Sequence, residues 1–99
     1  MKPTWEFAGN RFISAPFLWD DSLEGQIVAV RRQAMAGAYC TLSVYVSGAQ
    51  AAETWGCRDR IMPMVGTHTL SPDIERGTWV RLEFEFCPQR PETPDVTVL

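Results

Sequence analysis

The amino-acid sequence predicts an α+β domain that is built mainly on an antiparallel β-sheet. Residues 39–46 and 78–87 alternate apolar and polar side chains with the period of two that is typical of strands. Gly9-Asn10 separates two short β-prone segments, and Ser47 followed by Gln50 is typical of a helix start. We therefore expect a curved sheet or an open barrel of about five or six strands with one short helix. An all-β sandwich without the helix is the second choice.

The N-terminal segments 4–8 and 11–15 predict a β-hairpin, because Gly9 accepts the positive φ that a two-residue turn requires. Glu6 and Ile13 then share one face of the hairpin. The same register gathers three aromatic rings on the opposite face: Trp5, Phe7 and Phe12.

The next part of the chain predicts a loop followed by two strands. Residues 15–25 contain Pro16 and end at Gly25, which indicates a loop with room for one helical turn. Residues 26–32 carry apolar side chains on both faces, which favours a strand in the middle of a sheet or at a subunit contact. We expect the strand at 39–46 to pair with this one.

Residues 49–61 predict the helix, although a glycine in its middle, Gly56, costs about 1 kcal/mol. A strand at 54–58 is the alternative. Residues 64–70 predict a short strand or an extended link, and 72–76 predict a single helical turn that starts at a proline.

The strand at 78–87 has four apolar side chains on one face: Val80, Leu82, Phe84 and Phe86. We expect its other face to be largely solvated. Residues 1–88 then form a globular domain, and 89–99 form a Pro-rich C-terminal tail that ends in a strand-like segment. We expect a sheet edge of the same domain or of a second subunit to hold this tail.

Composition and charge exclude several classes of function. Nine Lys and Arg against twelve Asp and Glu give a net charge of -3, the wrong sign for a protein that binds nucleic acid. The longest fully aliphatic run, 27–30, is too short for a membrane span or an export signal, so we expect no membrane partner. Three widely spaced cysteines favour reduced thiols in the cytoplasm.

No segment carries a specific pattern for catalysis, a metal or a cofactor, so we predict that the chain is not an enzyme. His68 is the one histidine, the residue type best suited to base catalysis near neutral pH. A small hydrolase would require His68 to lie in a cleft beside a serine, a cysteine or a carboxylate. Together with Cys40, Cys57 and Cys87, it lacks the close-spaced ligand pair of zinc sites.

The run Asp20-Asp21-Ser22-Leu23-Glu24-Gly25 resembles the D-x-S-x-x-G element of PilZ domains, which are small β-barrels. The resemblance covers these residues only and implies binding of cyclic di-GMP. That family also carries an R-x-x-x-R motif upstream, whereas Arg11 is the only arginine before the element here. We therefore do not assign the chain to that family.

The remaining candidates for contact with a partner or ligand are aromatic rings near loops or on outward faces and two arginines: Trp19, Tyr39, Tyr45, Trp55, Arg58, Arg60 and Trp79. We predict a small non-enzymatic cytoplasmic accessory protein that acts through protein–protein contacts and self-associates as a homodimer. The alternative is a β-barrel that binds a nucleotide or sugar between aromatic rings and Arg58 or Arg60. The first hypothesis predicts a flat apolar patch, and the second predicts a concave pocket that contains Trp19 or Trp55.

Overall fold

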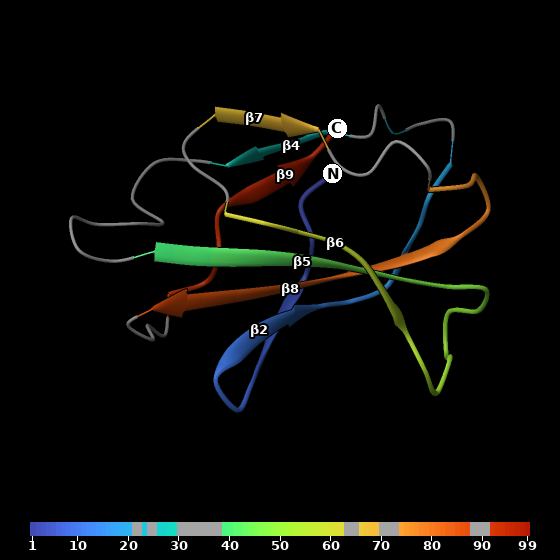
Figure 1. Ribbon diagram of the computed structural model, residues 1–99, viewed down its shortest axis with the longest axis horizontal. Coiled ribbons are helices and arrows are strands. Elements are labelled where there is room, and N and C mark those ends of the chain that lie inside the picture. Colours follow the sequence, from blue (N-terminus) through green and yellow to red (C-terminus); the bar gives the residue numbers. More distant parts are fainter. Residues whose placement is uncertain (21–22, 24–25, 30–38, 63–65, 70–73, 88–91) are drawn as a thin grey trace.

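The computed structural model describes residues 1–20, 23, 26–29, 39–62, 66–69, 74–87 and 92–99 (Figure 1). Within these ranges the chain forms strands, turns and irregular segments, and no helix. The strands are β1 (Trp5–Ala8), β2 (Arg11–Ser14), β3 (Phe17–Leu18), β4 (Gln26–Ala29), β5 (Tyr39–Ser47), β6 (Gly56–Ile61), β7 (Gly66–Thr69), β8 (Trp79–Cys87) and β9 (Val96–Val98).

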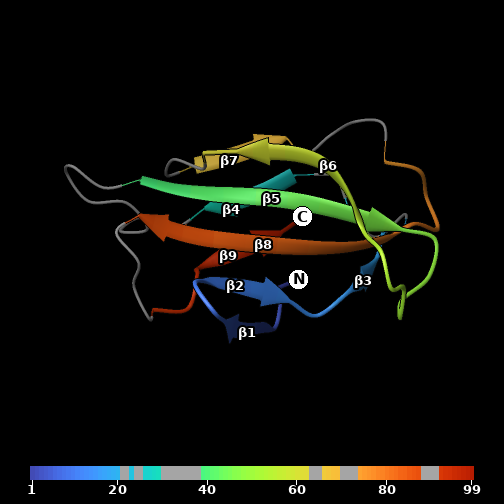
Figure 2. The same cartoon turned by 60° about the horizontal axis from the view of Figure 1, so that its bottom comes forward.

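The strands form two antiparallel sheets, which we call sheet A and sheet B. Sheet A has the order β1-β2-β8-β5-β6, with β3 pairing on β8, and sheet B has the order β7-β4-β9. The strands of sheet B run beside the long strands β5 and β8 of sheet A (Figures 1 and 2). Among the described residues β1 and β6 pair on one side only, so sheet A is open and the predicted barrel does not form.

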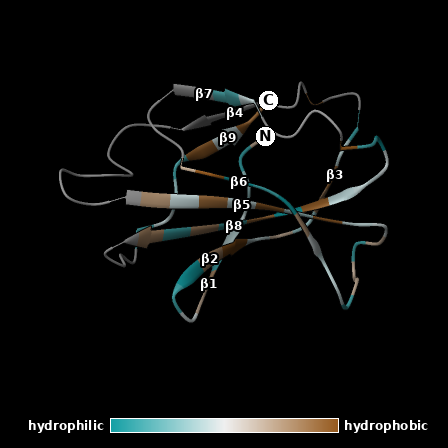
Figure 3. Ribbon diagram, in the orientation of Figure 1, coloured by the Kyte–Doolittle hydropathy of each residue, from teal (hydrophilic) through white to brown (hydrophobic). Residues whose placement is uncertain are grey.

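The alternation along β5 and β8 builds the core, as the sequence predicted. Leu42 and Leu82, one from each strand, are both 0% exposed. Val96 and Val98 of β9 are 2% and 0% exposed and belong to the same apolar cluster. In Figure 3, β9 carries hydrophobic colours, and hydrophobic and hydrophilic residues alternate along β5 and β8. The core therefore lies between the inner face of sheet A and sheet B.

The predicted hairpin of β1 and β2 is confirmed residue by residue. Ala8 pairs with Arg11 and Glu6 pairs with Ile13, and Gly9 has a φ of 70°. A side chain at this φ would be strained, which is why glycine suits the turn.

β2 and β3 follow the same edge of β8 with an interruption between them. From Phe12 to Phe17 the chain advances five residues, while the paired positions on β8 retreat only four, from Phe84 to Val80. Pro16 lies in this gap and has no N–H to donate. On β8, between the positions that pair with β2 and those that pair with β3, the N–H of Leu82 donates to the buried Ser14 Oγ at 2.8 Å. A side-chain hydroxyl thus replaces one backbone acceptor of the ladder.

The helix predicted at 49–61 is wrong. Ser47 Oγ accepts a hydrogen bond from the Ala49 N–H at 3.3 Å, so the Ser-x-x-Gln pattern starts a turn. The chain then returns as β6 along the edge of β5, which is nearer to the alternative strand at 54–58. The physical reason is that a nine-residue β5 exposes a long row of backbone groups, and pairing with β6 satisfies them.

Two predictions about strand neighbours have opposite outcomes. The strand at 26–32 was expected in the middle of a sheet, and β4 does lie between β7 and β9, while residues 30–32 are outside the described ranges. The expected pairing of 39–46 with this strand is wrong, because β5 pairs with β8 along its whole length. β5 and β8 are both nine residues long, so this pairing satisfies backbone groups along the whole of each strand.

The remaining segments near β8 and the C-terminus are partly described. Residues 72 and 73 of the helical turn expected at 72–76 lie outside the described residues, and 74–76 form no helix: the chain turns at 76–77, where the Thr78 N–H donates to Glu75 O at 3.2 Å and Gly77 has a φ of 89°. The strand-like segment at the C-terminus is β9, which pairs with β4.

Candidate functional site

The outer face of sheet A, which points away from sheet B, carries a chain of ion pairs centred on Glu83. Glu83 Oε1 is 2.9 Å from Arg11 Nη1, and Glu83 Oε2 is 2.9 Å from Arg81 Nη2. Arg11 also lies 3.5 Å from the Glu85 carboxylate. The hydrogen bond that Arg11 donates to Glu83, together with the nearby Glu83 and Glu85 charges, raises the pKa of Arg11 above its usual range. Glu83 is only 9% exposed, so the face of β8 expected to be largely solvated is partly covered.

Arg81 is held between two aromatic rings. Its guanidinium carbon lies 5.3 Å from the ring centroid of Tyr45 and 5.1 Å from that of Trp55. Trp55 belongs to the segment between β5 and β6, and its Nε1 donates to Ala52 O at 3.2 Å. The buried Arg81 Nε has no hydrogen-bond partner among the described residues. This arrangement fixes the position of the arginine and brings Trp55 over the sheet.

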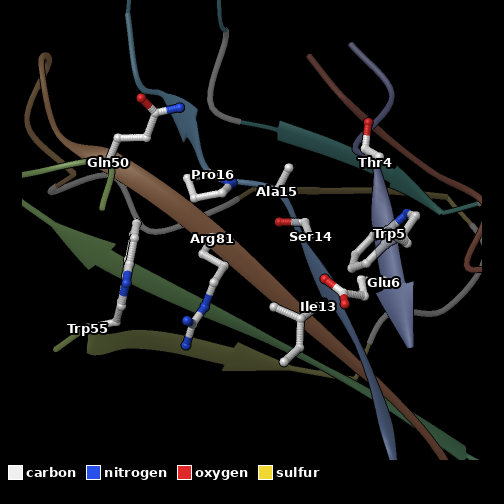
Figure 4. Close-up of a pocket in the computed structure, with 10 residues that line it drawn as sticks. All are labelled: Thr4, Trp5, Glu6, Ile13, Ser14, Ala15, Pro16, Gln50, Trp55 and Arg81. Atoms are coloured by element: carbon white, nitrogen blue, oxygen red, sulfur yellow. The ribbon is translucent and has the colours of Figure 1, made fainter. Parts of the chain in front are cut away.

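Beside Arg81 lies an open trough of about 470 Å³, within the size range of small-ligand sites. Figure 4 shows Trp55 and Arg81 at one end, and at the other Glu6 of β1 and Thr4, which precedes that strand. The trough is lined by Thr4, Trp5, Glu6, Ile13, Ser14, Ala15, Pro16, Gln50, Trp55 and Arg81. Because Glu83 already neutralises Arg81, the trough does not present a net positive charge to a ligand.

A second, smaller hollow on the same face has a volume of about 240 Å³. It lies between Arg11, Arg60, Glu83 and Glu85. Arg60 Nε donates to Ser43 Oγ at 3.1 Å. Two arginines against two glutamates leave this hollow without the positive charge that a phosphate group requires.

β1 forms the open edge of sheet A beside the trough. It pairs with β2 on one side, and no described strand pairs with it on the other. Phe7 is 46% exposed, and its ring lies 4.9 Å from that of the buried Phe12. Among the strand residues whose side chains are described, the large apolar ones that are exposed are Phe7 on β1 and Leu18 on β3.

The other edge of sheet A, β6, is protected against pairing with another chain. It carries three consecutive charged residues, Arg58, Asp59 and Arg60. Val44 pairs with Asp59 and Tyr45 with Cys57, so Arg58 is an extra residue that forms a β-bulge. Charges and bulges are the usual devices that keep an edge strand from pairing, and β1 contains no lysine, proline or bulge.

The edges of sheet B differ from β1 as well. On the β9 side the Val98 N–H donates to Met1 O at 2.8 Å, so the N-terminal residue occupies part of that edge. On the β7 side the two residues whose side chains are described, His68 and Thr69, are polar. Among the described strands, β1 is thus the longer of two edges that combine an open ladder with a large exposed apolar side chain, and the two-residue β3 with Leu18 is the other.

The residues singled out from the sequence are found in different places. Trp19 is 4% exposed and packs in the core, with the Arg76 guanidinium 5.9 Å from its ring, so it offers no exposed platform. Tyr45 and Trp55 come together around Arg81. The others are Arg58 at the bulge, Arg60 beside Ser43, the half-buried Trp79 opposite Ser47, and Tyr39, whose side chain lies outside the described residues.

Sequence reasoning missed Arg81 and Glu83 as the centre of the outer face, and it missed the exposure of β1. From the sequence alone Arg81 and Glu83 resemble ordinary solvated positions, because the residues that cover them, Arg11, Tyr45 and Trp55, come from other segments of the chain. The only available signal for β1 was its place at the N-terminal end of a hairpin, which often lies at a sheet edge.

The side chains considered for catalysis and metal binding do not converge in the described structure. His68 is half-buried on β7 opposite Ile27 and lines neither hollow of the outer face. Cys40 is buried, whereas Cys57 is exposed on β6. Within the described ranges, no three His, Cys, Asp or Glu side chains gather where they could hold a metal ion. In the same ranges no helix is long and apolar enough to cross a membrane.

Comparison with protein-family models, curated proteins and solved structures finds no match for this chain.

Proposed function

We propose that the chain is a non-catalytic interaction protein that binds a partner protein by accepting a β-strand along β1. The observation that carries this proposal is the contrast between the two edges of sheet A. β6 has three charges and a bulge, while β1 has an open ladder and the exposed ring of Phe7. Strand addition to an open edge is a common mode of protein recognition. We place this function in the cytoplasm, where the exposed thiol of Cys57 stays reduced.

Site-specific photo-cross-linking tests this proposal. The photoreactive residue p-benzoylphenylalanine replaces Phe7 in one variant of the full chain and Leu18 in a matched control. The two positions are comparably exposed, at 46% and 39%, and both lie on strands. After irradiation in cells, we expect a discrete protein adduct from position 7, identified by mass spectrometry, and none from position 18. Equal labelling at both positions, or no adduct from position 7, would overturn the proposal.

Binding of a small ligand in the trough is a second candidate function, because the trough contains Trp55, as that hypothesis predicted. The paired charges of the outer face favour a neutral sugar over a nucleotide. Titration with maltose and with AMP, followed by the NMR signal of the Trp55 indole, tests it. A Trp55 shift with maltose but not AMP supports this candidate, and an unchanged Trp55 signal with both probes excludes it for these ligands.

A further inference from the structure

We infer that the strand accepted by β1 comes from a different protein and has a lysine or arginine flanked by apolar residues. In this arrangement the apolar side chains lie against Trp5 and Phe7, and the basic side chain lies opposite Glu6. The inference rests on the function proposed for the β1 edge and specifies the chemistry of its partner.

The hydrogen bonds of the hairpin determine which groups of β1 are open. The Ala15 N–H donates to Thr4 O at 2.8 Å, so Thr4 directs its backbone groups towards β2. Because these directions alternate along a strand, Glu6 and Ala8 also face β2, and the N–H and C=O groups of Trp5 and Phe7 face outwards. An antiparallel strand can therefore form hydrogen bonds at these two residues.

The side chains on the same two residues set the apolar requirement. Trp5 and Phe7 lie on the inner face of the sheet, where the Trp5 ring packs edge-on against Phe84 with centroids 6.3 Å apart. Among the described residues Phe7 has one aromatic neighbour, Phe12, and it is 46% exposed. Apolar side chains on an added strand would cover the exposed part of this ring.

Glu6 sets the charge requirement. It is exposed on the outer face, and its cross-strand neighbour on β2 is the apolar Ile13. The arginine at the diagonal position, Arg11, already pairs with Glu83 and Glu85. A basic residue opposite Glu6 on an added strand would thus provide the opposite charge that β2 does not. The net charge of -3 also attracts a basic strand at longer range.

The same geometry argues against a second copy of this chain as the occupant. Antiparallel pairing of two β1 strands that uses both outward-facing residues sets Trp5 opposite Phe7 of the other copy. Glu6 then lies directly opposite the other copy's Glu6, and like charges at such positions are destabilising. The homodimer predicted from the sequence is therefore an outcome that the experiment must separate from binding of another protein.

Amide NMR spectra of the full chain, titrated with capped pentapeptides, test the inference. The first probe is acetyl-Thr-Val-Lys-Val-Thr-amide, and the matched control has glutamate in place of lysine. We expect the lysine peptide to shift the amides of Trp5 and Phe7 more than those of Glu6 and Ala8. We expect the control to bind about two- to five-fold more weakly, as for one cross-strand charge pair. In the variant Glu6→Lys this preference should reverse.

Equal binding of both peptides, or shifts centred on Trp55 and Arg81, would overturn the inference. It would also fail if the free chain already formed a dimer in which the β1 amides are protected. If neither peptide binds while position 7 still gives protein adducts, the partner chemistry is wrong and the proposed function stands. If position 7 also gives no adduct, both fail.

Discussion

The hydroxyl of Ser14 should contribute strongly to stability, and Ser14→Ala tests this. Ser14 is 2% exposed, and its Oγ accepts the N–H of Leu82, which is itself 0% exposed. The substitution removes the acceptor and leaves a backbone N–H in the core without a partner. Such a group costs about 1–3 kcal/mol of unfolding free energy. For a domain of about 100 residues this corresponds to a fall in Tm of about 4–20 °C.

Ser47→Ala is the matched control, because Ser47 Oγ also accepts a backbone N–H, that of Ala49, at 3.3 Å in an exposed turn. Water can replace this acceptor, so we expect a change within about 0.5 kcal/mol. Urea and thermal unfolding followed by circular dichroism measure both variants. If Ser14→Ala proved no less stable than Ser47→Ala, the Leu82 N–H would not depend on the Ser14 hydroxyl as its acceptor.

Three further predictions follow from the same structure. Glu83→Gln removes a nearly buried charge from between two arginines and should cost about 1–2 kcal/mol in urea unfolding, less than a fully buried pair because the arginines are partly exposed. The control Glu85→Gln, on a carboxylate that is 45% exposed, should change stability by less than about 0.5 kcal/mol. Gly9→Ala should cost about 1–2 kcal/mol in the same assay, because Gly9 has a φ of 70° while its surroundings leave room for the methyl group. Native-state hydrogen exchange should be faster at the amides of Trp5 and Phe7 than at the alternate β1 positions, and equal rates would contradict the open edge.

Local patterns predicted those parts of the fold in which neighbouring residues determine the geometry. The hairpin register followed from the length of its turn, since a two-residue link allows Ala8 to pair only with Arg11. The inward face of β8 followed from alternation, and its four apolar side chains are buried. In both cases the relevant interactions lie within a few residues or follow from a fixed period.

The errors concern interactions between distant segments. Ser47 and Gln50 have the pattern of a helix start, but the need of β5 for a partner at its edge makes the following residues a strand. In the same way β5 pairs with β8 and not with β4, which is nearer in the sequence. The pairing of strands depends on matching length and pattern across many residues. No local signal in the sequence contains that information.

The candidate site was only partly predictable for a related physical reason. Tyr45 and Trp55 were recognised as candidates, but the residue that unites them, Arg81, acquires its role only when β5, β6 and β8 are assembled. The openness of β1 depends on the absence of a neighbour in the described sheet, which no pattern within β1 itself reveals.

The distribution of charge over sheet A connects its stability with the proposed recognition. Arg11 and Arg81 balance Glu83 and Glu85 in the middle of the outer face, so these charges hold neighbouring strands together and leave little net field for an anionic ligand. At the β6 edge, consecutive charges and a bulge oppose pairing with another chain. Glu6 differs from the balanced charges in the middle of the sheet, because it is exposed at the β1 edge and its cross-strand neighbour is apolar. An edge that lacks the protection found on β6, and that carries a single acidic side chain, selects among possible partner strands by charge instead of repelling all of them.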